Sequence, residues 1–141
     1  MAEIKIFTTN YYNSFIEVAD DTKAIASKIP ISKNVSKTIA EMQYEILINH
    51  PYKYTSDEIL FQIFASRNKI AISEYDDARN QFFSKGQPCL RTSPLAKTYG
   101  FGIHFDIDGK VAIYGMETEE YQQFLNDPKI KKIKSLNSRK K

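Results

Sequence analysis

Residues able to do chemistry are concentrated in the third quarter of the chain. All five glycines lie between residues 86 and 115, together with the single cysteine, Cys89, and one of the two histidines, His104. Glycine serves where the backbone needs a positive φ or a close approach. The pair 93–94, Ser-Pro, has the pattern of a helix N-cap followed by proline at the first helical position. Free amides at such a helix start attract anions, so this segment is the first candidate site.

An anion-binding site is the function that this segment favours. Arg91 and Lys97 would add positive charge beside the helix start, and His104 would contact the same ligand. The hydroxyl of Ser93 and its neighbouring amides would complete the site, with Tyr99 as one wall. We therefore expect a non-enzymatic binding domain for an anionic small molecule. The competing interpretation is a capped loop whose basic side chains are solvated or paired with acids.

A cysteine-dependent enzyme is the second hypothesis. Catalysis would need a thiolate at Cys89, a base within hydrogen-bond reach and a group that orients the base. His104 or His50 would be that base, but the sequence supplies only the residue types. A lone cysteine is more often a small buried hydrophobe. The pattern therefore favours a binding protein over an enzyme.

Motifs for metals and cofactors are missing from the sequence. The two histidines, His50 and His104, are far apart, with no second cysteine and no ligand pair at helical spacing. The run 106–109, Asp-Ile-Asp-Gly, resembles part of a calcium loop, but its first and twelfth positions would be His104 and Gly115. Neither residue carries the required carboxylate. We predict no metal and no cofactor.

Positive charge is concentrated at the end of the chain. The net charge is +3 over 141 residues, yet every charged residue from Lys129 onward is basic. We expect residues 1–128 to form one domain and residues 129–141 a flexible basic tail. Such a tail can bind nucleic acid or an acidic partner surface, which is the third hypothesis. The alternative is a solvated terminus that aids solubility.

The composition is that of a globular protein from a reducing compartment. Hydrophobic residues make up 42% and charged residues 26%, which are ordinary values. A single cysteine excludes an intramolecular disulfide. The N-terminus lacks the features of a signal peptide, and no apolar run approaches the roughly 18 residues that span a bilayer. We expect a cytoplasmic protein without membrane association, and the sequence leaves its oligomeric state open.

Helices are expected in the middle of the chain. Segment 38–50 has both an alternating and a helical pattern, but a Thr-x-x-Glu capping box opens it and a proline follows it, which favours helix. A second capping box begins at Thr55. A further start at Ser73 leads to Gly86 as a C-cap. The helices that start at Thr55 and Ser73 are therefore predicted to form an αα-hairpin, and segment 38–85 as a whole is predicted to be helical.

Two hairpins are predicted to form the sheet, in segments 4–19 and 101–116. In the second hairpin, a three-residue loop with Gly109 left-handed separates apolar from polar side chains, whereas a two-residue turn would mix them on both faces. This register puts His104 on the wetter face. The dry face carries Ile103, Phe105, Val111 and Ile113. We expect an α+β domain: a small, mostly antiparallel sheet covered by the αα-hairpin and a helix over 117–126.

Four strings of the sequence resemble a known family. They are TTNY at 8–11, PYKYTSD at 51–57, GQPCLRTSPL at 86–95 and KTYGFGIH at 97–104. They are similar to a family of small bacterial proteins classed as a domain of unknown function. The resemblance covers nearly the whole chain up to the basic tail. It implies a single bacterial cytosolic domain and supplies no activity, ligand or catalytic residue.

Overall fold

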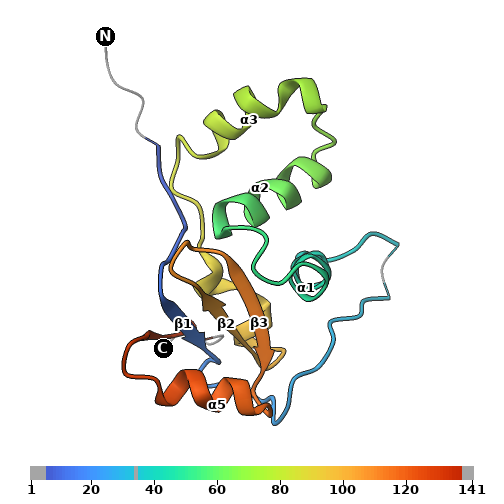
Figure 1. Ribbon diagram of the computed structural model, residues 1–141. Helices are drawn as coiled ribbons and strands as arrows, with labels where there is room; N and C mark the ends of the chain where they lie inside the picture. Colours follow the sequence, from blue (N-terminus) through green and yellow to red (C-terminus); the bar gives the residue numbers. More distant parts are fainter. Residues whose placement is uncertain (1–5, 34, 138–141) are drawn as a thin grey trace.

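A four-stranded mixed sheet organises the fold (Figure 1). The computed structural model describes residues 6–33 and 35–137. The spatial order of the strands is β3-β2-β1-β4. Strand β2 is antiparallel to both β1 and β3, whereas β4 is parallel to β1. The strands are β1 Ser14–Glu17, β2 Phe101–Phe105, β3 Val111–Gly115 and β4 Lys131–Lys134. The chain is therefore of the predicted α+β class.

Helices cover both faces of this sheet. On one face α1 packs against β3 and α4 against β2, and on the other α5 packs against β1 and β3. Helix α2 packs on α1, and α3 lies beyond α2, away from the sheet (Figure 1). The helices are α1 Ile39–Asn49, α2 Ser56–Arg67, α3 Tyr75–Phe82, α4 Pro94–Lys97 and α5 Glu119–Asn126, with short 3-10 turns at Ile72–Glu74 and Leu90–Thr92.

Local capping chemistry sets most of the helix starts. Thr38 and Thr55 both form complete capping boxes with the glutamate three residues later, as predicted. The third helix is different, because it begins at Tyr75 after a 3-10 turn instead of at Ser73. It ends at Phe82, so Gly86 is not its C-cap, and that prediction was wrong.

The β2–β3 hairpin has the predicted register. Asp106 donates its N–H to the carbonyl of Lys110 at 2.9 Å across a three-residue loop. Gly109 has a φ of +80°, and an added Cβ there would lie 2.9 Å from the Tyr12 ring. The Asp106 carboxylate also accepts the N–H groups of Asp108 and Lys110. The dry face lies in the main core with Ile16, Leu47, Ile59, Leu90 and Leu95.

The opposite face of the hairpin, which carries His104, is also shielded from solvent. The expectation that this face would be the wetter one was wrong. Helix α5 covers it, and Phe15 packs there against Tyr121. His104 is only 8% exposed and stacks on Phe124 with ring centroids 4.1 Å apart. Alternation separates the two faces of a strand pair, but it does not show that a helix covers the second one.

The predicted hairpin over 4–19 does not form. Residues 4 and 5 lie outside the described part of the chain, and among the others only Ser14–Glu17 make a strand. Strand β1 pairs with β2 on one side and β4 on the other, so neither of its edges is left for the preceding residues. The stretch 6–13 runs along the helices instead, where Phe7 donates its N–H to the carbonyl of Phe83 at 2.8 Å.

A buried carboxylate holds this N-terminal stretch against α2. Asp57 is 8% exposed and accepts hydrogen bonds from the N–H and Oγ1 of Thr9 and from Oγ1 of Thr8, each at 2.7 Å. The N–H of Asp57 donates in turn to Oδ1 of Asn10 at 2.9 Å. Because Asp57 lies in the first turn of α2, its negative charge also interacts favourably with the helix dipole.

Part of the predicted basic tail belongs to the sheet. Lys131–Lys134 is strand β4, and Nζ of Lys134 lies 3.2 Å from Glu17 and 3.1 Å from Asp20. The fold therefore continues past residue 128, whereas 138–141 lie outside the described residues. Lysines are common on edge strands because they discourage pairing with other chains. The positive run that predicted a flexible tail is, over four residues, an edge strand.

Candidate functional site

The residues predicted to bind an anion do not converge on one site. Arg91 donates from Nε to the carbonyl of Lys134 at 2.7 Å, so its guanidinium is engaged at the edge strand β4. His104 lies on the α5 face of the sheet. Tyr99 packs partly buried against the main core, and Lys97 ends a helix of only four residues.

Ser93 is the N-cap of α4, as predicted, but its hydroxyl has a further partner. It accepts the N–H of Leu95 at 3.1 Å and donates to Oε1 of Gln43 at 2.6 Å. Both Ser93 and Gln43 are buried at 3% exposure. Ser93 therefore joins α4 to α1 instead of facing an open anion site.

The cysteine and the histidine proposed for catalysis are on opposite sides of the sheet. Sγ of Cys89 lies 3.2 Å from the hydroxyl of Tyr11, whose ring packs on Phe105 in the core face. His104 is the residue before Phe105, so its side chain points to the other face. Burial and the hydrogen bond between Tyr11 and Cys89 raise the pKa of Tyr11 to about 12, so Tyr11 is neutral near pH 7 and is no base for the thiol.

His104 takes part in a partly buried polar cluster under α5. Its Nδ1 lies 2.8 Å from the hydroxyl of Tyr52, and the same hydroxyl lies 2.8 Å from that of Tyr114. Burial lowers the pKa of His104, although Asp106 and Asp127 partly oppose the shift. Burial also raises the pKa of Tyr52, so both His104 and Tyr52 favour their uncharged forms. Through these hydrogen bonds, Tyr52 connects the loop after α1 to strands β2 and β3.

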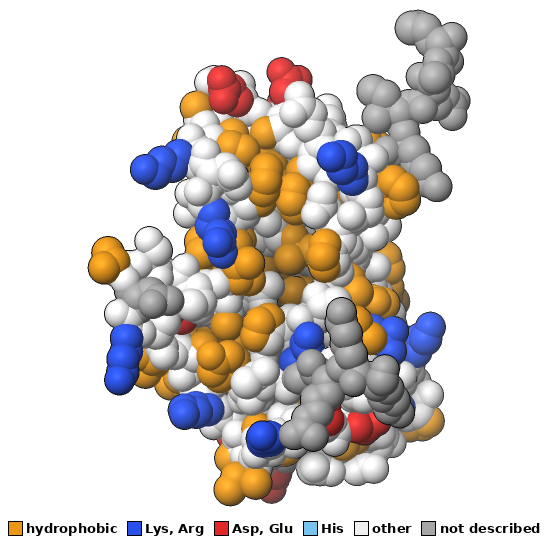
Figure 2. Space-filling model, turned by 180° about the vertical axis from the view of Figure 1, so that it is seen from behind, with side chains coloured by type: hydrophobic (Ala, Val, Ile, Leu, Met, Phe, Trp, Pro, Cys, Tyr) orange, Lys and Arg blue, Asp and Glu red, His pale blue; other side chains and the backbone are white. Residues whose placement is uncertain are grey.

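A pocket that the sequence did not predict lies between α1, α2 and segment 87–94. Its volume is about 380 Å³, within the range of small-molecule sites. Seen from the side opposite to that of Figure 1, the molecule has hydrophobic side chains gathered in a hollow near its middle (Figure 2). The apolar walls include Ile39, Leu60, Ile63, Phe64, Phe82 and Pro88.

Helix α2 supplies one wall of the pocket. Leu60, Ile63, Phe64 and Arg67 follow a spacing that places side chains on one helical face. The same helix also buries Ile59 and Phe61, which do not line the pocket. Helix α2 therefore carries more apolar residues than it needs to pack against one neighbouring element. That excess was the one signal in the sequence for a second apolar surface. The rings of Phe64 and Phe82, with centroids 4.6 Å apart and planes inclined by 31°, close the pocket toward α3.

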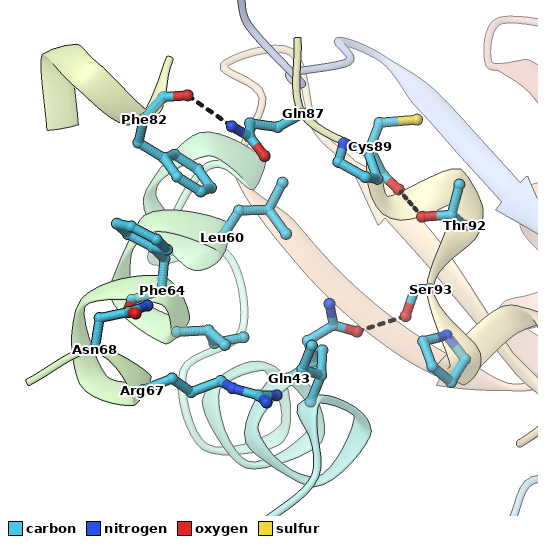
Figure 3. Close-up of a pocket in the computed structure, with 14 residues that line it drawn as sticks. Gln43, Leu60, Phe64, Arg67, Asn68, Phe82, Gln87, Cys89, Thr92 and Ser93 are labelled. Atoms are coloured by element: carbon cyan, nitrogen blue, oxygen red, sulfur yellow. Dashed lines mark hydrogen bonds between the residues drawn. The ribbon is translucent and has the colours of Figure 1, made fainter. Parts of the chain in front are cut away.

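Among the polar side chains that line the pocket, Gln43 of α1 and Arg67 of α2 stand out because neither side-chain nitrogen group is hydrogen-bonded to another described residue. Figure 3 shows the amide oxygen of Gln43 turned to Ser93 and its nitrogen turned toward the space below Leu60. No described residue forms a hydrogen bond with this Nε2 atom. Arg67 extends from the end of α2 toward α1, and it is the only charged residue among the described ones that line the pocket (Figure 3). The site therefore offers donors at one end and hydrocarbon along its walls.

A sequence-family model matches residues 6–141 of the chain. The chain belongs to DUF6157, a family of unknown function. No curated protein and no solved structure matches it. The DUF6157 match includes the basic segment after residue 128, in agreement with the place of β4 in the sheet. Since the function of the family is unknown, the function of this chain must be argued from the pocket.

Two further findings concern the described part of this DUF6157 chain. None of its helices combines the length and apolar character needed to cross a membrane. Within the same residues, no three His, Cys, Asp or Glu side chains gather as ligands for a metal ion.

Proposed function

We propose that this DUF6157 protein is a non-enzymatic binding domain for a small, largely apolar ligand in the pocket between α1, α2 and segment 87–94. The observation that carries the proposal is the amide of Gln43, which is buried and fixed by Ser93 yet open to the pocket through Nε2. The proposal keeps part of the glycine-containing segment as a ligand site. It replaces the predicted cationic site with an apolar cavity.

The free energy of filling this pocket favours a ligand over water. Apolar walls in contact with water are unfavourable, and covering them gains about 25 cal/mol per Å² of apolar surface. The Nε2 donor of Gln43 is open to the pocket, and a ligand that displaces water from it without supplying an acceptor would cost about 1–3 kcal/mol. Water entering the pocket satisfies only the amide, whereas a ligand with an acceptor atom satisfies the amide and covers the walls.

The single cysteine supports a site in a reducing compartment, and we propose a cytoplasmic location for the protein. There Cys89, which is partly buried beside the pocket, would remain a free thiol.

Binding is tested with N-phenyl-1-naphthylamine, an uncharged dye whose fluorescence rises in apolar surroundings. We expect saturable binding of one dye per chain. Leu60→Trp fills the pocket from its wall and should weaken dye binding at least tenfold. Its matched control is Ile107→Trp, which adds the same ring at an exposed position of the hairpin loop.

Both variants are first checked for a native circular dichroism spectrum and a cooperative thermal transition. Binding should then be unchanged in Ile107→Trp. The proposal fails if the wild-type chain gives no saturable signal, or if the folded Leu60→Trp variant binds the dye as tightly as the control does.

A further inference from the structure

We propose that the natural ligand is an amphipathic carboxylate, with its acid group held between Arg67 and Gln43 and its hydrocarbon body against Leu60, Phe64 and Phe82. This inference rests on the proposed function, because it names the ligand class of the same pocket. It adds a negative charge to the ligand and assigns that charge to two residues.

Arg67 supplies the charge. It is the only ionised side chain on the described lining, and no acidic residue in the described part of the chain forms an ion pair with it. A cation in the last turn of α2 is favourable for the helix dipole, which explains a basic residue at this position. The dipole does not explain why its side chain extends over an apolar pocket toward α1 (Figure 3). A carboxylate beside the guanidinium gives that side chain an ionic partner, with two parallel hydrogen bonds where the geometry allows.

Gln43 supplies a second, neutral donor on the opposite helix. The hydroxyl of Ser93 accepts the N–H of Leu95 and donates its own proton to Oε1 of Gln43. The amide of Gln43 is therefore oriented with Oε1 toward Ser93, and its two N–H bonds remain for the pocket. A carboxylate has two oxygens, so one can accept from Nε2 of Gln43 while the other faces Arg67. An alcohol or an amine would use only part of this arrangement.

The rest of the pocket excludes a strongly polar ligand. Its remaining walls are side chains of leucine, isoleucine, phenylalanine and proline together with several neutral polar ones, and no acidic group lines it among the described residues. The polar side chains of Asn68, Gln87 and Thr92 each donate a hydrogen bond to a backbone carbonyl. A phosphate or a sugar would therefore lose water there and find few free donors in exchange. A volume of about 380 Å³ is at the small end for ligand sites, which fits a short fatty acid or an aromatic acid.

The test compares octanoate with 1-octanol, which share a chain length and differ in charge, as competitors for the bound naphthylamine dye at pH 7.5. In Arg67→Gln the affinity for octanoate should fall about tenfold, while that for 1-octanol changes less than twofold. Gln43→Glu keeps an acceptor for Ser93 and removes the donor. It should also weaken octanoate more than 1-octanol. Lys97→Gln is the control, since Lys97 ends α4 and does not line the pocket.

The outcomes separate the two proposals. If Arg67→Gln weakens octanoate and 1-octanol equally, or leaves octanoate unchanged, the carboxylate inference is wrong while the pocket remains a binding site. The same holds if the dye binds and neither compound displaces it. If the dye itself does not bind, the proposed function fails. A loss of octanoate binding in Lys97→Gln equal to that in Arg67→Gln would also refute the inference, because a general change of surface charge would then explain both.

Discussion

Gly102→Ala should destabilise the protein by pushing α5 away from the sheet. A Cβ built at Gly102 would lie 2.3 Å from Cζ of Phe15 and 2.6 Å from Cε2 of Tyr121. Carbon atoms in contact prefer about 3.5–4.0 Å, so these rings must move by about 1 Å. Phe15 is fully buried, and the hydroxyl of Tyr121 accepts the N–H of Val18 at 3.0 Å. Both rings are buried, so they cannot move into solvent, and α5, which carries Tyr121, must shift away from β2.

The expected magnitude follows from two opposing effects. Overpacking a core costs about 1–3 kcal/mol. Replacing glycine by alanine also restricts the unfolded chain, which returns about 0.4–1 kcal/mol. The net loss in free energy of unfolding should therefore be near 2 kcal/mol. With a urea m-value of about 2 kcal/mol/M, the midpoint should fall by about 1 M at unchanged m.

The assay is urea denaturation followed by circular dichroism, with Gly86→Ala as the matched control. Gly86 is exposed, and a Cβ there would meet only Cδ1 of Phe7 at 4.0 Å, an ordinary contact. The urea midpoint of the Gly86→Ala variant should equal that of the wild type or be slightly higher. If Gly102→Ala and Gly86→Ala unfold at the same urea concentration, the close packing of α5 on β2 does not constrain residue 102, and the reasoning is refuted.

Two other substitutions test buried polar groups. Asp57→Ala removes the acceptor of three short hydrogen bonds and should lower the free energy of unfolding by about 3 kcal/mol. Asp76→Ala, in the exposed first turn of α3, should cost far less in the same urea titration, and equal losses would contradict the role of Asp57. Burial lowers the pKa of His104, so the unfolded chain binds a proton before the folded chain does, and stability should fall as the pH drops below about 6.5. Urea midpoints at pH 7.5 and 5.5 should show a smaller fall in His104→Gln than in the wild type, and an NMR titration placing the pKa of His104 at or above 6.5 would overturn this.

Local rules explain the parts of the fold that the sequence predicted. The capping boxes at Thr38 and Thr55 involve residues three apart, and both helices begin there. The register of the β2–β3 hairpin follows from Gly109 and the alternation beside it. These features depend on neighbours in the chain, so composition and spacing were sufficient to predict them.

The partners of β1 and the pocket depend on distant residues. Strand β1 pairs with segments from the last third of the chain, and no pattern near residue 14 indicates them. Ser93 was identified as an N-cap, but its bond to Gln43 joins residues 50 positions apart. Arg91 and Lys97 were predicted to bind a ligand because they are positively charged and close to Ser93 in the sequence. The cation that lines the pocket is Arg67, which the amphipathic spacing of α2 places at the pocket edge. Spacing along the chain cannot distinguish a helical face that packs from one that is left open.

The position of β1 between β2 and β4 determines when a nascent chain can complete its sheet. The side chain of Asn13, just before β1, donates to the carbonyl of Lys129, 116 positions later. Until β4 has been synthesised and has left the ribosome, β1 has one open edge, although α1 and α2 can already form from local contacts. Closing so long a loop is slow, and open strand edges promote aggregation. Completion of the sheet is therefore expected to wait until β4 is free to pair with β1.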